Sequence, residues 1–210
     1  MTVVAVTPVD KRRCKVLLDE GFALVLYRGE IKKYGIEENG ELSEECYQEI
    51  LRDVLCKRAR ERVIHLLKNM DRTEEQLRRK LKDGGYPKEA IDYALSFVKE
   101  RRYVNDESYA RRYTECFSER KSRKQIAYDL KMKGIDGEII ARALEETVID
   151  EDRQIGALLE KRGFAPGNCV NESRENMAAA RKEYQKMADF LARKGFSWEA
   201  IRRAMGEMGE

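Results

Sequence analysis

Apolar residues recur with one spacing in three separate stretches of this chain. In each stretch, two apolar residues four apart precede a glycine, and a small residue follows nine positions after it. Residues four apart lie on one helical face, and a glycine behind them permits the left-handed C-cap that ends a helix. The three glycines are Gly85, Gly134 and Gly195. This self-similarity predicts a tandem helical repeat.

Start signals divide each stretch into helices. Thr73 and Ser122 open capping-box patterns twelve residues before their glycines, whereas the third copy has Glu183 at that place. The first two helices of the third copy are therefore expected to run together or to start elsewhere. The expected helices are 43–69, 73–83 and 87–101 in the first repeat, 106–119, 122–132 and 136–147 in the second, and 150–161, 174–194 and 197–208 in the third.

The N-terminal residues differ from the rest. Residues 1–13 are expected to form a polar, weakly ordered arm. The apolar runs 15–18 and 22–27, separated by Asp19, Glu20 and Gly21, predict a β-hairpin. Residues 28–30 are expected to make another turn before residues 31–36, which are counted with the same β element.

These elements predict a mainly α protein whose repeats stack into an elongated curved array, with a small N-terminal β-hairpin element, because a three-helix unit buries little core alone. The expected domains are an N-terminal arm and β element at 1–42, and repeats at 43–103, 104–149 and 150–210. The third repeat carries an inserted loop near 163–173.

Composition narrows the function. Charged residues make up 39% of the chain, five cysteines form no CxxC pair, and His65 is the only histidine. We therefore expect reduced thiols in a cytoplasmic protein, with no metal site and no cofactor. No signal peptide or membrane span is predicted. Neither a phosphate-binding glycine loop nor a nucleophile paired with a base is evident, so we expect no enzymatic activity.

Charge is clustered along the chain. Residues 57–82 contain ten Lys or Arg against four Asp or Glu, and residues 119–133 contain six against two. Residues 37–53 and 136–152 each hold seven acidic residues and one arginine. Solvated helix faces explain such clusters, but the basic ones fall on the second helix of successive repeats, which favours a charged partner or nucleic-acid phosphates.

We select six basic residues as candidate contacts to an acidic partner surface or to DNA. Tyr109, Tyr113 and Tyr128 lie near the same basic helices, and we expect them to be core residues rather than stacking platforms. The six candidates are Arg78, Arg79, Arg123, Lys124, Lys131 and Lys133.

Four segments resemble a known family. The segment 103–110 (YVNDESYA), the segments 122–126 (SRKQI) and 130–135 (LKMKGI), and the C-terminal segment 191–197 (LARKGFS), in this order, are similar to the RecX family of recombination regulators. The resemblance covers roughly residues 15–208. It implies tandem three-helix repeats, in some members with an N-terminal β extension.

The resemblance also implies a function. It implies a non-enzymatic modulator, expected to be negative, that binds the filament of RecA recombinase on single-stranded DNA and restrains its ATPase and strand exchange. Single- or double-stranded DNA is a further expected contact, and a monomer is expected. The alternative is a general helical DNA- or RNA-binding module, because three-helix units often contain helix-turn-helix geometry. A plain helical scaffold is a third interpretation.

Overall fold

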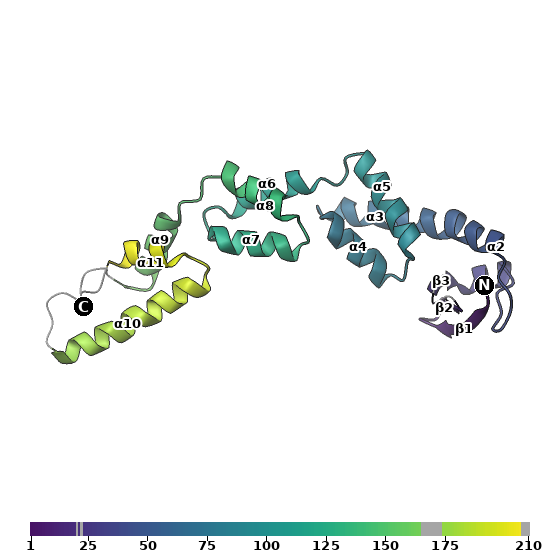
Figure 1. Cartoon of the computed structure of the whole chain (residues 1–210), viewed down its shortest axis with the longest axis horizontal. Coiled ribbons are helices and arrows are strands. Elements are labelled where there is room, and N and C mark those ends of the chain that lie inside the picture. The colour runs from purple at the N-terminus through teal and green to yellow at the C-terminus, as the bar shows by residue number, and fades with distance from the viewer. Residues whose placement is uncertain (20, 22, 165–173, 207–210) are drawn as a thin grey trace. The chain divides into compact units, whose positions relative to one another are not determined.

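The computed structural model describes residues 1–206 apart from 20, 22 and 165–173. The chain divides into two compact units, Met1–Asn105 and Asp106–Glu210. The first holds a small sheet and one group of helices, and the second holds two further groups (Figure 1). Within the described ranges, every helix is too short or too polar to cross a lipid bilayer. Most of the loop expected over 163–173 lies outside the described residues.

The N-terminal sheet is antiparallel with strand order β1-β2-β3. Its strands are Val3–Pro8 (β1), Arg13–Leu18 (β2) and Ala23–Tyr27 (β3). The predicted hairpin is confirmed as β2 and β3, which pair from Arg13 with Tyr27 to Leu17 with Ala23. Alternate residues face inward and are almost completely buried. These inner residues are Val16, Leu18, Leu24 and Leu26.

Two N-terminal predictions are wrong. Residues 1–13 are not an arm, because β1 pairs with β2 and the Val3 side chain is 1% exposed. Residues 28–36 do not extend the sheet, because Arg28–Lys33 forms helix α1. The Glu30 carboxylate accepts a hydrogen bond from the Tyr27 amide at 2.8 Å, which satisfies a donor at the start of that helix.

The first repeat starts with a helix that runs from residue 44 to residue 69, as predicted. It comprises α2 (Glu44–Glu49), a π-helical segment η1 (Ile50–Cys56) that was not predicted, and α3 (Lys57–Asn69). The other two helices, α4 (Glu74–Asp83) and α5 (Lys88–Glu100), match their predicted positions to within one residue. The Thr73 capping box forms with Gln76 as predicted.

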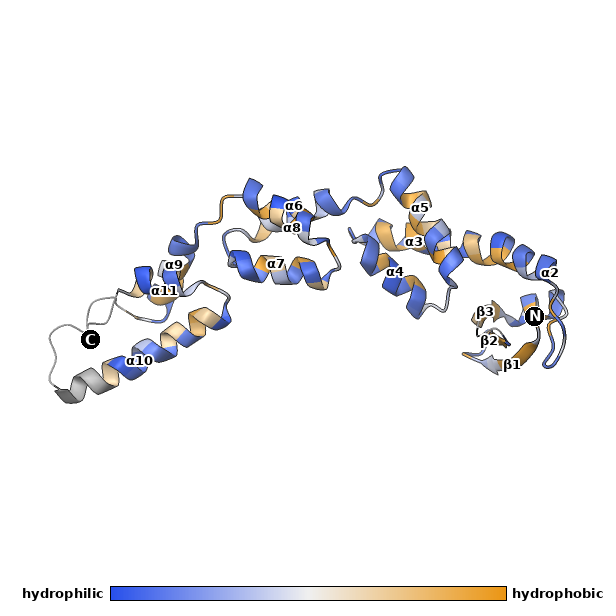
Figure 2. Cartoon of the chain, viewed as in Figure 1, coloured by the Kyte–Doolittle hydropathy of each residue, from blue (hydrophilic) through white to orange (hydrophobic). Residues whose placement is uncertain are grey.

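The second unit contains two groups of helices. Figure 2 shows that most helices carry both hydrophilic and hydrophobic residues, as expected for small bundles with wide solvated faces. Helix α10 runs unbroken past Glu183, in agreement with the missing cap there. The helices are α6 (Asp106–Phe117), α7 (Arg123–Met132) and α8 (Gly137–Glu146), then α9 (Glu151–Lys161), α10 (Arg174–Arg193) and α11 (Trp198–Met205).

The glycine turns form as predicted. Gly85, Gly134 and Gly195 have φ of 76°, 83° and 87°, in the left-handed region. The amide after each glycine donates to the carbonyl five residues earlier, at 3.2 to 3.3 Å, as in a Schellman motif. The apolar side chain after each glycine thereby folds back onto its repeat. These pairs, donor first, are Tyr86 and Leu81, Ile135 and Leu130, and Phe196 and Leu191.

The first glycine turn also packs against the sheet. A Cβ atom added to Gly85 would lie 2.4 Å from Cγ2 of Val25 on β3. Beside it, the Arg58 guanidinium lies 4.5 Å from the centre of the Tyr27 ring, donates to the Val25 carbonyl at 3.4 Å and pairs with Glu30. The sheet is therefore held on the first repeat by the close approach of Gly85 to Val25 and by the contacts of the half-buried Arg58.

We predict that Gly85→Ala destabilises the first unit by about 2–4 kcal/mol, because left-handed strain adds to the clash with Val25. Val25→Ala should recover about 1–2 kcal/mol of that loss by removing the clashing methyl groups. Urea unfolding followed by circular dichroism measures both effects.

Gly35→Ala is the matched control, since Gly35 has φ of 60° and nothing within 4 Å of an added Cβ. It should cost only the backbone strain, about 1–2 kcal/mol. Equal losses for the two glycines would contradict the close packing of Gly85 on β3.

Candidate functional site

The second helix of each repeat presents three solvent-facing positions at ten, six and three residues before its glycine. Residues with this spacing share one helical face. In α4 they are Glu75, Arg79 and Lys82, and in α10 they are Gln185, Asp189 and Ala192. In α7 they are Lys124, Tyr128 and Lys131. The three faces can therefore be compared position by position.

On α4 and on α10, two side chains of this face bond to each other. Arg79 Nε lies 2.9 Å from a carboxylate oxygen of Glu75, one helical turn away. The Gln185 amide donates to the Asp189 carboxylate at 2.8 Å. Such i,i+4 pairs cancel or occupy the groups that would otherwise recognise a partner.

The α7 face differs in that its two lysines are unpaired. Lys124 and Lys131 are exposed, and no acidic side chain in the described part of the chain pairs with either ammonium. Tyr128 lies between them with 59% of its surface exposed. We call Lys124, Tyr128 and Lys131 the α7 face. An aromatic ring flanked by two free cations matches the composition of single-strand nucleic-acid sites.

The expectation that Tyr128 is a core residue is wrong. Tyr109 and Tyr113 do pack against the second repeat's apolar core, as expected. Tyr128 does not, because it lies two residues from both Ile126 and Leu130, which are completely buried. A two-residue step turns a helix by about 200°, so this ring is carried to the outer side. The two-residue spacing of Tyr128 from Ile126 and Leu130 could therefore have predicted its exposure from the sequence.

The other candidate residues have partners inside the fold. Arg78 bridges Asp92 at 2.7 Å and Glu74 at 3.3 Å, and these hydrogen bonds, that to Asp92 first, raise the pKa of its guanidinium. Arg79 pairs with Glu75, as noted above. The Arg123 guanidinium donates to the Leu144 carbonyl at 3.1 Å. The structure thus ties these three arginines to neighbouring helix residues.

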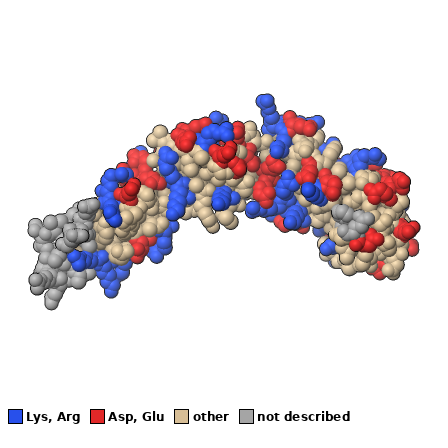
Figure 3. All heavy atoms as spheres, viewed as in Figure 1, with Lys and Arg blue, Asp and Glu red and all other residues tan. Residues whose placement is uncertain are grey.

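Lys133, the sixth candidate, lies over two aromatic rings. Its Nζ is 5.4 Å from the centre of the Tyr113 ring and 5.9 Å from that of Tyr109. Cation–π contacts of this kind stabilise a partly exposed ammonium. Figure 3 shows the wider setting, in which basic and acidic side chains are interspersed over the visible face of the molecule.

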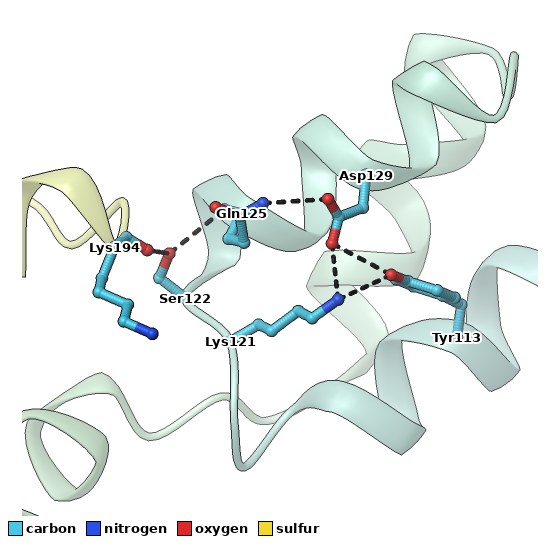
Figure 4. A network of polar contacts seen from close by, with 6 residues as sticks. All are labelled: Tyr113, Lys121, Ser122, Gln125, Asp129 and Lys194. Atoms are coloured by element: carbon cyan, nitrogen blue, oxygen red, sulfur yellow. Dashed lines mark hydrogen bonds and ion pairs between the residues drawn. The ribbon is translucent and has the colours of Figure 1, made fainter. Parts of the chain in front are cut away.

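A polar network supports the inner side of α7 (Figure 4). Lys121 Nζ lies 2.7 Å from Asp129 Oδ2, and the Tyr113 hydroxyl donates to the same oxygen at 3.1 Å. The Gln125 amide donates to Asp129 Oδ1 at 3.0 Å. Burial alone raises the pKa of Asp129, but hydrogen bonds from Lys121, Gln125 and Tyr113 outweigh it and the pKa is lowered. Asp129 is therefore ionised and fixes the loop before α7.

Ser122 joins α7 to the third repeat. Its hydroxyl oxygen accepts a hydrogen bond from the backbone N–H of Gln125 at 3.2 Å, which caps α7. The same hydroxyl donates to the Lys194 carbonyl at 2.9 Å. A Cβ added to the adjacent Gly195 would lie 2.7 Å from the Ser122 hydroxyl. Only a glycine allows this approach, so the third repeat's turn rests directly on the helix start that bears the α7 face.

Comparisons with known proteins agree on one family. Family models of RecX match residues 59–97 as the first three-helix domain, 105–144 as the second and 174–205 as the third. The regulatory protein RecX of Caldanaerobacter subterraneus is 31% identical over 191 residues, which cover 90% of each chain. That of Clostridium botulinum strain Alaska E43 is 26% identical over 198 residues, covering 94% of this chain and 91% of the relative.

Solved structures share the fold. A crystal structure of regulatory protein RecX aligns with a TM-score of 0.62 at 22% identity, covering 98% of this chain and 99% of the other. RecX from Lactobacillus salivarius aligns with a TM-score of 0.57 at 22% identity, covering 72% and 94%. The tandem three-helix architecture is thus common to these proteins.

We predict that Asp129→Asn lowers the free energy of unfolding by about 1–2 kcal/mol at neutral pH, because Lys121 loses its half-buried partner. Since the folded-state pKa of Asp129 is lowered, its contribution is complete above the unfolded carboxyl pKa and is lost as pH falls through the folded one. The difference from the parent protein should therefore shrink below about pH 4. Chemical unfolding across the acid range measures it.

Glu107→Gln serves as the control, because its pair with Arg142 at 3.2 Å has both side chains more than half exposed. It should change stability by less than about 0.5 kcal/mol. A pH-independent loss in Asp129→Asn would show that the carboxylate charge is not what stabilises the loop.

Proposed function

Because this chain belongs to the RecX family, we propose that it regulates the RecA recombinase. It binds the RecA filament on single-stranded DNA in the cytoplasm, acts as a monomer and restrains the ATPase and strand exchange of the filament. The observation that carries the proposal is the match of three successive RecX domains along one chain. The action is non-enzymatic and works through binding.

The α7 face is the surface that we assign to the filament. Lys124 and Lys131 contact phosphates or acidic filament groups, and Tyr128 stacks on an exposed base. Arg78, Arg79, Arg123 and Lys133 have a secondary role, since their internal partners would have to be given up first. Each exchange of an internal partner for an external one gains little net energy.

The α7 face has two free cations, which favours a filament over naked DNA as its target. Two phosphate contacts on a single strand give a salt slope of about −1.4, far below the slopes of proteins that bind DNA tightly by themselves. Naked DNA is therefore held weakly by the α7 face. A filament adds protein surface to the same contact, so binding there is stronger.

A general nucleic-acid-binding module is the second candidate function, and the exposed Tyr128 between two lysines is the observation in its favour. The two candidates differ in what they require. A module binds single-stranded DNA equally well with or without recombinase, whereas a filament regulator binds the coated strand more tightly. Binding measured on both substrates at several salt concentrations separates them.

We predict that the purified protein lowers the single-stranded-DNA-dependent ATPase of its cognate RecA at substoichiometric to near-equal amounts. The double change Lys124→Glu with Lys131→Glu should raise the concentration needed for half inhibition by at least about tenfold, because both cations are replaced by repelling charges.

Lys80→Glu with Lys82→Glu is the matched control, since it makes the same charge change on exposed positions of α4. It should inhibit like the parent protein. Equal losses in both double variants would mean that net charge alone acts, and no inhibition by the parent protein would reject the proposal.

We predict that Tyr128→Ala weakens filament binding by about 1–3 kcal/mol, the range measured for one stacked base, whereas Tyr128→Phe retains binding because it keeps the ring. Fluorescence anisotropy of RecA filaments on labelled DNA, titrated with each variant, measures the difference. Because the ring is exposed, neither change should alter helicity. Equal affinity of the alanine and phenylalanine variants would exclude stacking.

A further inference from the structure

A cleft of about 570 Å³ lies in the second unit, where the third repeat meets the second. This is within the usual size range of ligand clefts, about 300–1,000 Å³. None of the three residues of the α7 face lines it. The cleft has apolar residues from both repeats and basic residues around them. The apolar set is Phe117, Leu158 and Phe196, and the basic set is Arg120, Lys161 and Lys194.

The walls of the cleft are fixed by bonds between the repeats. Ser122 joins the start of α7 to the Lys194 carbonyl at 2.9 Å. The Gln154 side chain, on α9, donates through Nε2 to the Ser118 carbonyl at 2.6 Å and to the Lys121 carbonyl at 3.2 Å. The cleft is therefore a preformed feature of the junction, and ligand binding there needs little reorganisation.

Gln154 leaves one buried acceptor unused. The residue is 7% exposed, and its Oε1 has no hydrogen-bond donor within the described part of the chain. A buried carbonyl oxygen without a donor costs about 1–3 kcal/mol. Although Gln154 lines the cleft, this oxygen is closed to solvent, so a ligand in the cleft does not reach it.

The charges around the cleft are unbalanced. The Lys121 ammonium is neutralised by Asp129, but in the described ranges no carboxylate pairs with Arg120 or Lys161. Lys194 Nζ lies 5.7 Å from the centre of the Phe190 ring, a contact that leaves its charge uncompensated. Glu119 is the remaining acidic residue of the lining, so positive charge predominates.

We propose that this cleft binds an acidic peptide segment of a partner protein, with an apolar side chain on Phe117 and Leu158 and carboxylates on Arg120 and Lys161. An acidic peptide supplies both features together. A nucleic-acid strand fits less well, because its charges follow one another along a continuous backbone and it has no aliphatic side chain to place on Phe117 and Leu158 between them. The inference goes beyond the proposed regulation of a filament and uses a separate surface.

The test is a titration of the full chain against a fluorescein-labelled peptide of about ten residues in which aspartate and phenylalanine alternate. We expect saturable anisotropy that falls as salt is added. Arg120→Glu with Lys161→Glu should weaken binding at least about tenfold, and Lys161→Gln should weaken it less. The α7-face variant, Lys124→Glu with Lys131→Glu, should bind the peptide like the parent protein, which keeps this result separate from the ATPase assay.

Two control ligands test the chemistry of the cleft. A peptide with asparagine in place of aspartate should bind at least about tenfold more weakly, and an oligothymidylate of equal charge should not displace the acidic peptide. Absence of saturable binding, equal binding of the asparagine peptide, or unchanged affinity in the Arg120 and Lys161 variant with normal helicity would overturn the proposal. Displacement by the oligothymidylate would also overturn it and identify a nucleic-acid cleft instead.

Discussion

The left-handed turn at the end of each repeat's second helix is the constraint on which the rest of the structure depends. It stops one helix, folds the next apolar side chain back onto the core and starts the third helix in the direction that closes the bundle. Glycine is needed for a second reason at two of the turns. At Gly85 the backbone approaches Val25, and at Gly195 it approaches the hydroxyl of Ser122. One residue therefore ends a helix and also provides a docking point.

Repeats built in this way share a core but present different outer surfaces. On the corresponding face, α4 has an ion pair between Arg79 and Glu75, and α10 has a hydrogen bond between Gln185 and Asp189. The lysines of the α7 face have no such partner in the described part of the chain. Counting basic residues would rank α4 with α7, yet pairing within the helix separates them. Our assignment of filament contacts to α7 follows from this difference in pairing rather than from the number of charges.

The two surfaces that we propose are suited to different partners. The α7 face has separate cations on either side of a flat ring, which suits an extended polyanion with bases. The cleft combines apolar residues with basic residues around them, which suits an acidic peptide. Both rest on the same junction, since Ser122 caps α7 and also holds the loop that carries Lys194. The position of the third repeat thus affects both surfaces.

The sequence by itself determined the helices of the three repeats and their glycine turns, because each depends on residues within about four positions of one another. The Arg79 and Glu75 pair, four residues apart, was also open to prediction. Tertiary structure decided the rest. Asp92, one partner of Arg78, is fourteen residues away, and Lys194, one partner of Ser122, is 72 residues away. Strand β1 needed a neighbouring strand for its hydrogen bonds, and whether a lysine is free or paired is known only when every carboxylate has been placed.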